Sequence, residues 1–134
     1  MKLNAELFDK VLEIAKASDR RRMHYDLRTQ AGCEGWCDMS QRMLNVMMPD
    51  TIVPIHRHND TSETVIVCRG KVRLDFYDEK RNKIEEYVLE YGSDSPGVQI
   101  PKGMYHTCVC LEAGSVIFEA KDRAYSMTTE DMLG

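Results

Sequence analysis

Apolar residues recur at helical spacing near the N-terminus, between charged residues, and this pattern ends before residue 20. Asn4 stands directly before the pattern and is a residue type that caps helix N-termini. The pattern predicts one amphipathic helix over residues 5–16 that packs on the rest of the chain. Its apolar positions are Leu7, Phe8, Val11, Ile14 and Ala15.

From Gln41 onward the chain consists of short apolar runs separated by polar turns, and the charged run 78–83 is the clearest hairpin loop. About eight short strands with no helical period between them are typical of a β-sandwich or barrel. We therefore expect an all-β fold with one N-terminal helix. The predicted strand segments are RMLNVMMP, TIVPIHRH, ETVIVCRG, KVRLDFYD, KIEEYVLEYG, GVQIP, YHTCVCLE and GSVIFEAK.

The same patterns predict three parts along the chain. Residues 1–40 would hold the helix and a basic loop segment that packs on the barrel, because the glycines of HYDLRTQAGCEGWC favour irregular structure. Residues 41–126 would form the barrel, and residues 127–134 a C-terminal tail.

Size and charge narrow the classes of partner. A chain of 134 residues with 43% hydrophobic residues is long enough to bury the core of one domain. The net charge of −4 provides no general attraction to a polyanion. We expect neither a nucleic acid nor a membrane as partner.

The N-terminal segment MKLNAELFDKVLEIAK lacks the continuous apolar core of a secretory signal, and no apolar run is long enough to span a bilayer. The cysteine count of five is odd, which is typical of reduced thiols rather than of a disulfide framework. These features predict a cytoplasmic protein. The cysteines are Cys33, Cys37, Cys68, Cys108 and Cys110.

Three histidines and one glutamate are spaced so that they can meet inside the barrel. His56 and His58 point to the same side of a strand, and Glu63 begins the next strand after a polar turn. The turn Pro101-Lys102-Gly103 leads to His106 at the start of another strand. Imidazole and carboxylate ligands suit a divalent transition metal such as Fe, Mn, Co, Ni or Zn, with coordination positions left open.

These residues resemble the two motifs of the cupin superfamily, which are usually written G-x5-H-x-H-x3-4-E-x6-G and G-x5-P-x-G-x2-H-x3-N. The residues that match are His56, His58, Glu63, Gly70, Pro101, Gly103 and His106. Three positions differ from the motifs, and they are Asp50, Ser95 and Cys110. The resemblance implies a jelly-roll barrel with a metal bound by His56, His58, Glu63 and His106.

More narrowly, the chain resembles the WbuC-family cupin-fold metalloproteins, which are associated with bacterial lipopolysaccharide O-antigen gene clusters. The resemblance implies a role in sugar-nucleotide or surface-polysaccharide metabolism, and it covers most of residues 20–125. The segments that carry it are RRRMHYDL, QRMLNVMMPDTIVPIHRH, ETVIVCRGKV, VQIPKGMYHT and IFEAKDRAY.

The leading interpretation is a metal-dependent isomerase or epimerase that binds a small polar ligand, such as a sugar or sugar nucleotide. Two alternatives stay open: an Fe(II)-dependent oxygenase, and a non-catalytic cupin in which the metal only organises a ligand pocket. By analogy with other cupins we also expect a homodimer.

Weaker signals supply the remaining candidates. His24 and Tyr105 are candidate catalytic residues, although His24 is more often a solvated loop histidine. Further side chains have a facing that strand parity alone does not decide, and they are Gln99, Glu119 and Lys121. The run Arg20, Arg21 and Arg22 is most often a solvated basic surface, and its functional alternative is an anion clamp for phosphate or carboxylate. The candidate substrate contacts are Arg21, Arg22, Tyr25 and Asn45.

Overall fold

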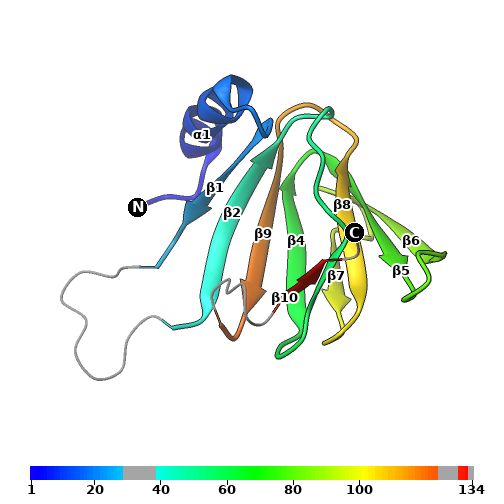
Figure 1. Cartoon of the computed structure of the whole chain (residues 1–134). Helices are drawn as coiled ribbons and strands as arrows, with labels where there is room; N and C mark the ends of the chain where they lie inside the picture. The colour runs from blue at the N-terminus through cyan, green and yellow to red at the C-terminus, as the bar shows by residue number, and fades with distance from the viewer. Residues whose placement is uncertain (29–38, 124–129, 133–134) are drawn as a thin grey trace.

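The computed structural model describes residues 1–28, 39–123 and 130–132. They form a sandwich of two five-stranded antiparallel sheets with one helix, α1 (Ala5–Ala17), near the N-terminus (Figure 1). One sheet has the order β1 (Arg22–Asp26), β2 (Gln41–Met47), β9 (Ser115–Lys121), β4 (Glu63–Arg69) and β7 (Gly97–Ile100). The other has the order β10 (Glu130–Met132), β3 (His56–His58), β8 (Tyr105–Cys110), β5 (Lys71–Tyr77) and β6 (Lys83–Glu90). The predicted all-β jelly roll is confirmed.

Helix α1 forms where the apolar period predicted it. The Asn4 side chain accepts a hydrogen bond of 3.2 Å from the Leu7 backbone N–H, which caps the helix. The apolar face of α1 packs against the β1–β2–β9 end of the first sheet, on the side that faces away from the second sheet. The buried residues of this layer are Leu7, Phe8, Val11, Leu44, Val46 and Val116.

The main core lies between the two sheets. It is built from the alternate inward positions of the strands, as the period of two requires. Its buried side chains are Met47, Val65, Val67, Val72, Leu74, Phe76, Leu89, Ile100, Cys108, Cys110 and Ile117. Polar side chains replace the apolar ones toward His56 and His58, and the functional cavity is found there.

Two strands were not predicted. Strand β1 lies in the segment that we expected to be a loop, and it pairs with β2 so that His24 lies opposite Asn45. Strand β10 lies in the predicted tail and pairs with β3, with Met132 opposite His56. Both are edge strands whose hydrogen-bond partners are distant in sequence, so short polar stretches gave no local signal. The predicted division at residues 41 and 127 stays a prediction.

Cys33 and Cys37 lie outside the described residues. In the described part of the chain, Cys68, Cys108 and Cys110 are free cysteines. The described part of the chain contains no helix that is both long enough and apolar enough to pass through a bilayer.

Gly70 makes the tight turn between β4 and β5. It has a φ of +81°, in the left-handed region, and a Cβ atom there would meet the Ser115 side chain and lie 3.0 Å from Ser115 Cα. Ser115 Oγ accepts a 3.0 Å hydrogen bond from the Lys71 backbone N–H, so it cannot move away without breaking this contact. The turn therefore depends on glycine for both its conformation and its space.

Gly70→Ala should cost more stability than Gly92→Ala. Gly92 has nearly the same φ of +80° but nothing within 4 Å of the added Cβ, so its substitution carries only backbone strain of about 1–2 kcal/mol. Overpacking against Ser115 should add about 1–3 kcal/mol for Gly70→Ala. Urea denaturation of both variants measures the difference, and equal losses would contradict this account of the turn.

Candidate metal centre

Three histidines meet at one point between the sheets. His56 and His58 come from β3, and His106 comes from β8, where it lies directly opposite His56 in the antiparallel register. One ring nitrogen from each of the three lies within 4.8 Å of the others. His58 and His106 are buried and His56 is half-buried, so the cluster opens toward the cavity on one side. This convergence is the one that the sequence predicted.

Two of the three rings are held by backbone carbonyls. His56 Nδ1 donates a 2.8 Å hydrogen bond to the Pro54 carbonyl, and His106 Nδ1 donates one of 2.9 Å to the Met104 carbonyl. Because a carbonyl only accepts, the neutral ring then carries its proton on Nδ1 and leaves Nε2 as a lone-pair donor. This is the usual way in which proteins orient metal-binding histidines.

Burial keeps His106 neutral. Loss of hydration and the neighbouring His56 lower the pKa of His106 to about 4. At neutral pH the ring is therefore unprotonated at one nitrogen, as metal binding requires.

Glu63 reaches the histidines from the opposite sheet. Its Oε2 atom lies 3.1 Å from His58 Nε2, and both side chains are buried. Burial alone raises the pKa of Glu63, but the hydrogen bond from His58 and the nearby charges together outweigh it and hold the pKa below its ordinary value. The carboxylate is thus an anionic donor next to the imidazoles.

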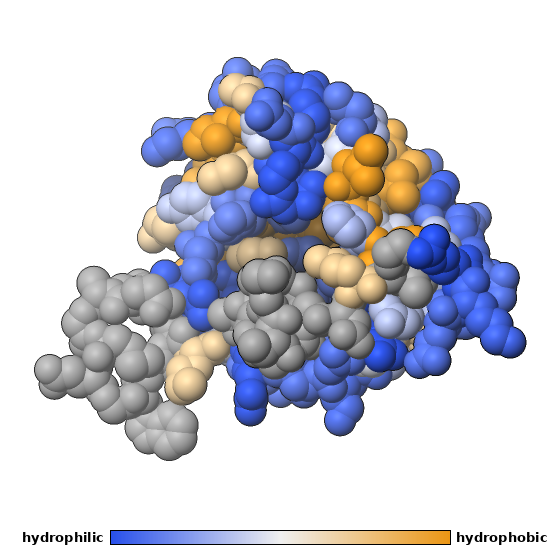
Figure 2. Space-filling view, viewed as in Figure 1, coloured by the Kyte–Doolittle hydropathy of each residue, from blue (hydrophilic) through white to orange (hydrophobic). Residues whose placement is uncertain are grey.

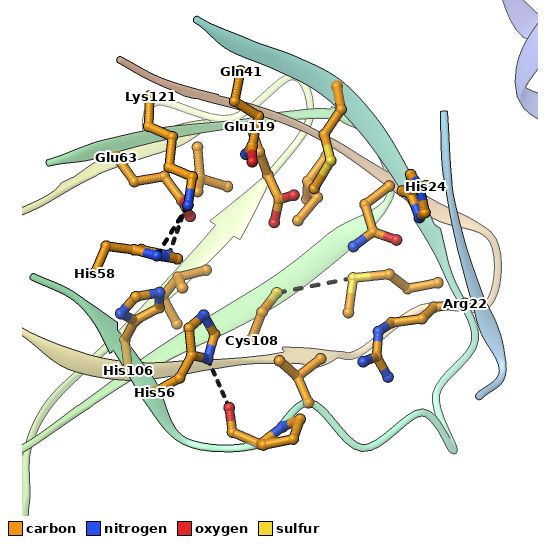
Figure 3. A pocket seen from close by; sticks show the side chains of 18 of the residues that line it. Arg22, His24, Gln41, His56, His58, Glu63, His106, Cys108, Glu119 and Lys121 are labelled. Atoms are coloured by element: carbon orange, nitrogen blue, oxygen red, sulfur yellow. Dashed lines mark hydrogen bonds and ion pairs between the residues drawn. The ribbon is translucent and has the colours of Figure 1, made fainter. Parts of the chain in front are cut away.

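Lys121 completes a chain of three buried groups. Its Nζ atom lies 3.0 Å from His58 Nδ1 (Figure 3). An ammonium group can only donate, so His58 accepts at Nδ1 and carries its proton on Nε2, which lies 3.1 Å from Glu63 Oε2. An ion bound at His58 Nε2 would take the place of that proton. With their nitrogen and carboxylate donors, the residues present fit a divalent transition metal.

A cavity of about 600 Å³ opens beside this cluster. Arg22 and His24 lie on its opposite side from the three histidines, with Cys108 between them (Figure 3). Figure 2, which has the same view as Figure 1, shows a hollow near the middle of the molecule, below hydrophilic side chains. The size is that of a pocket for a small organic ligand.

The inner wall of the first sheet carries polar residues in rows across neighbouring strands. Lys121 of β9 lies opposite both Gln41 of β2 and Glu63 of β4, so these three form one row. Glu119 lies two residues before Lys121 and faces the cavity from the next row. Sequence parity left Glu119 and Lys121 undecided, because only the register with Glu63 determines their side of the sheet.

The other sequence candidates are divided between two faces. Arg22, His24 and Asn45 line the cavity. The exposed Gln99 instead accepts a 2.6 Å hydrogen bond from the half-buried Thr64 on the outer side.

Three candidates do not line the cavity. Tyr25 follows His24 on β1, so its ring points to the other face and packs with the α1 layer. Tyr105 precedes His106 and therefore also faces away, with the Arg57 guanidinium 4.6 Å from its ring centre. Arg21 has a φ of 56° and pairs with Asp50 at 3.0 Å. Alternation along the strands explains the outward position of the two tyrosines.

Comparison with known proteins supports the fold. A family model described as a domain of unknown function (DUF6016) matches residues 3–89. No curated protein matches the sequence. The solved structures that resemble the chain have the cupin fold.

The similar structures belong to longer proteins. The capsular polysaccharide assembling protein CapF from Staphylococcus aureus is 24% identical, with a TM-score of 0.59, over 71% of this chain and 28% of that chain. Oxalate oxidase in complex with the substrate analogue glycolate is 12% identical, with a TM-score of 0.63, over 81% and 54%. A mutant of Bacillus subtilis oxalate decarboxylase is 19% identical, with a TM-score of 0.60, over 84% and 28%. The chain thus spans about a quarter to a half of their lengths.

The metal-free protein should lose stability as the pH falls from about 6.5 toward 4. In this window His106 binds a proton in the unfolded chain but not in the folded one, so unfolding is favoured by acid. The slope for one such group is at most about 1.4 kcal/mol per pH unit. Urea denaturation across this range should show a smaller slope for His106→Gln than for the wild type. The exposed His24 serves as control: His24→Gln should keep the slope, and an unchanged slope in His106→Gln would contradict the assignment.

Proposed function

The chain belongs to the family described as a domain of unknown function (DUF6016), and we propose from its site that it is a metal-dependent cupin enzyme acting on a sugar or sugar nucleotide. The observation that carries the proposal is the cluster of His56, His58 and His106 within 4.8 Å, beside a cavity of about 600 Å³. A mononuclear site with Glu63 as the fourth ligand would leave coordination positions open toward the cavity.

The donor set favours a divalent transition metal, namely Fe, Mn, Co, Ni or Zn, over Ca or Mg, which prefer oxygen ligands. When bound, such an ion acts as a Lewis acid toward a carbonyl or hydroxyl oxygen. The protein would orient that oxygen through the polar wall of β2 and β9. This fits isomerase or epimerase chemistry, in which a proton leaves a carbon atom and returns.

Side chains able to move protons line the same cavity, which favours an enzyme over a non-catalytic binding protein. The Glu119 carboxylate can accept a proton, and the Lys121 ammonium and the His24 imidazole can donate one. These groups come from β9 and β1, on the first sheet, whereas the three histidines come from the second. A substrate between the sheets would thus contact the metal side and the proton-transfer side together.

The role in bacterial surface polysaccharide metabolism is supported by two resemblances. The sequence resembles the WbuC family, associated with lipopolysaccharide O-antigen gene clusters, and the fold resembles that of a capsular polysaccharide assembling protein. Both are analogies at the level of family and fold. A cytoplasmic location and a homodimer belong to the same proposal. The exposed apolar residues Ile84 and Val88 on the edge strand β6 are consistent with a covered edge in a dimer.

Protein purified without chelator should contain about one transition metal per chain, as measured by elemental analysis. His106→Ala should weaken metal affinity by more than the roughly 10–100-fold that loss of an outer-shell partner costs. His24→Ala removes an imidazole from the opposite side of the cavity and should leave metal content unchanged. Wild-type protein that is metal-free and binds none of Fe, Mn, Co, Ni or Zn would overturn the proposal.

The metal-loaded protein should catalyse exchange of a carbon-bound hydrogen of a sugar nucleotide with heavy water, detected by mass spectrometry over a panel of sugar nucleotides. Glu119→Gln keeps the shape of the side chain but removes its base, so we expect the exchange rate to fall by about 10²–10⁴-fold while metal content stays the same. Metal-dependent oxygen consumption without exchange would favour the oxygenase alternative, and ligand binding without either reaction would favour a non-catalytic cupin.

A further inference from the structure

The side of the cavity opposite the histidines is basic. Arg22 and His24 are two residues apart on β1, so both side chains point to the cavity (Figure 3). Arg20 also lines it. This strand is the edge of its sheet and lies next to β2. Two arginines, the half-buried Arg22 and the exposed Arg20, therefore lie beside the same cavity, where a negatively charged ligand relieves their repulsion.

Hydrogen bonds to neutral acceptors hold the Arg22 side chain in place. Its Nη1 atom donates to Thr51 Oγ1 at 3.2 Å and to the Ile52 carbonyl at 3.0 Å, and both acceptors are neutral. Among the described residues, no carboxylate forms an ion pair with Arg22. Burial, followed by the charge of Arg20, lowers the pKa of Arg22, and the Glu119 carboxylate offsets only part of this effect.

The neighbouring Arg21 is different in each of these respects. It lies outside the cavity and pairs with Asp50 through two contacts, of 3.1 and 3.0 Å. The two arginines are adjacent in sequence and equal in charge, but only Arg22 presents a guanidinium group to the cavity. They provide a matched pair for an experiment.

Asn45 lies between the basic side and the centre of the cavity. It is the cross-strand neighbour of His24, and its Oδ1 atom is buried with no hydrogen-bond partner among the described residues. A buried carbonyl oxygen is normally satisfied, so this atom is available to accept a hydrogen bond from a ligand in the cavity. A hydroxyl group of a sugar supplies such a donor.

We propose that the cavity binds an anionic polyhydroxy compound, such as a sugar phosphate or a sugar acid. Its phosphate or carboxylate group lies at Arg22 and Arg20, one hydroxyl donates to Asn45, and the remaining oxygens extend toward the histidine cluster. The volume of about 600 Å³ is sufficient for a monosaccharide with its charged group. This inference deepens the proposed function and rests on it for the end that faces the metal.

The orientation follows from the charges of the inner wall. Glu63 and Glu119 place two carboxylates on the half of the cavity that β4 and β9 line, against the single ammonium group of Lys121. An anionic group is therefore favoured at the arginine end, where the guanidinium fork can form two charge-assisted hydrogen bonds. The uncharged hydroxyl or carbonyl groups are left for the histidine end, where a metal would bind oxygen.

Binding to protein freed of metal with chelator tests the anion end by itself. Isothermal titration calorimetry would compare glucose 1-phosphate, gluconate, glucose and inorganic phosphate. We expect one of the two sugar anions to bind more tightly than inorganic phosphate, and glucose not to bind. The preference between glucose 1-phosphate and gluconate shows whether the natural ligand carries a phosphate or a carboxylate.

Two substitutions locate the anion. Arg22→Met should weaken binding of the preferred sugar anion by about 10–100-fold, because it removes charge-assisted hydrogen bonds. Arg21→Met removes the same charge one residue away and should leave the affinity unchanged. Arg22→Lys keeps the charge but not the fork, so it should bind with intermediate affinity, and it is the substitute if Arg22→Met fails to fold in a thermal melt.

A third substitution tests the hydroxyl contact. Asn45→Leu should weaken binding of the preferred sugar anion and leave the binding of inorganic phosphate unchanged. The anion site would be overturned if no anion binds at millimolar concentration, or if Arg21→Met and Arg22→Met have equal effects. His106→Ala distinguishes the anion site from the metal site. This variant should lose metal binding and keep anion binding, so a failure of the metal proposal would not by itself overturn the anion site.

Discussion

The contact between Glu63 and His58 is the constraint on which the rest of the site depends. It joins the two sheets through buried polar atoms 3.1 Å apart, in a region where an apolar core would otherwise form. A buried carboxylate is costly unless it is paired and hydrogen-bonded. The imidazoles on one side and Lys121 on the other satisfy this requirement, so each group of the polar cluster is stabilised by its neighbours. Its groups keep this end of the sandwich hydrophilic and accessible to a ligand.

The sandwich is thus divided into two functional halves. One half is filled by apolar side chains from both sheets and supplies stability. The other half is hollow, and polar groups share its lining with core side chains such as Met47, Val65 and Leu74. Packing of α1 on the outer side of β1 and β2 supports the hollow half from behind, since Leu44 and Val46 are buried under the helix while Asn45 between them faces the cavity. The same strand therefore serves both stability and binding.

Much of this arrangement could be predicted from the sequence. The helix followed from its apolar period, and the meeting of His56, His58 and His106 followed from strand alternation and from the turn before His106. These are local patterns. The inward position of Lys121 and Glu119 depends on the register between β9 and β4, and the existence of β1 depends on pairing with a strand about fifteen residues further along the chain. Tyr25 and Tyr105 were candidates for the site, but each is next to a cavity histidine on its strand, and alternation turns adjacent residues to opposite faces. That rule, applied strictly once each strand is known, separates them from the cavity.

Strand β3, which carries two of the three imidazoles, has few partners of its own. It shares one pair of facing residues with β8, but three with β10, at Glu130–Met132. The short strand β10 therefore holds β3, and with it the two histidines, in position. An affinity tag, a cleavage or a fused protein next to β10 would disturb the alignment of the imidazoles while the apolar core stayed folded. Such a preparation would look intact by circular dichroism and still carry little metal.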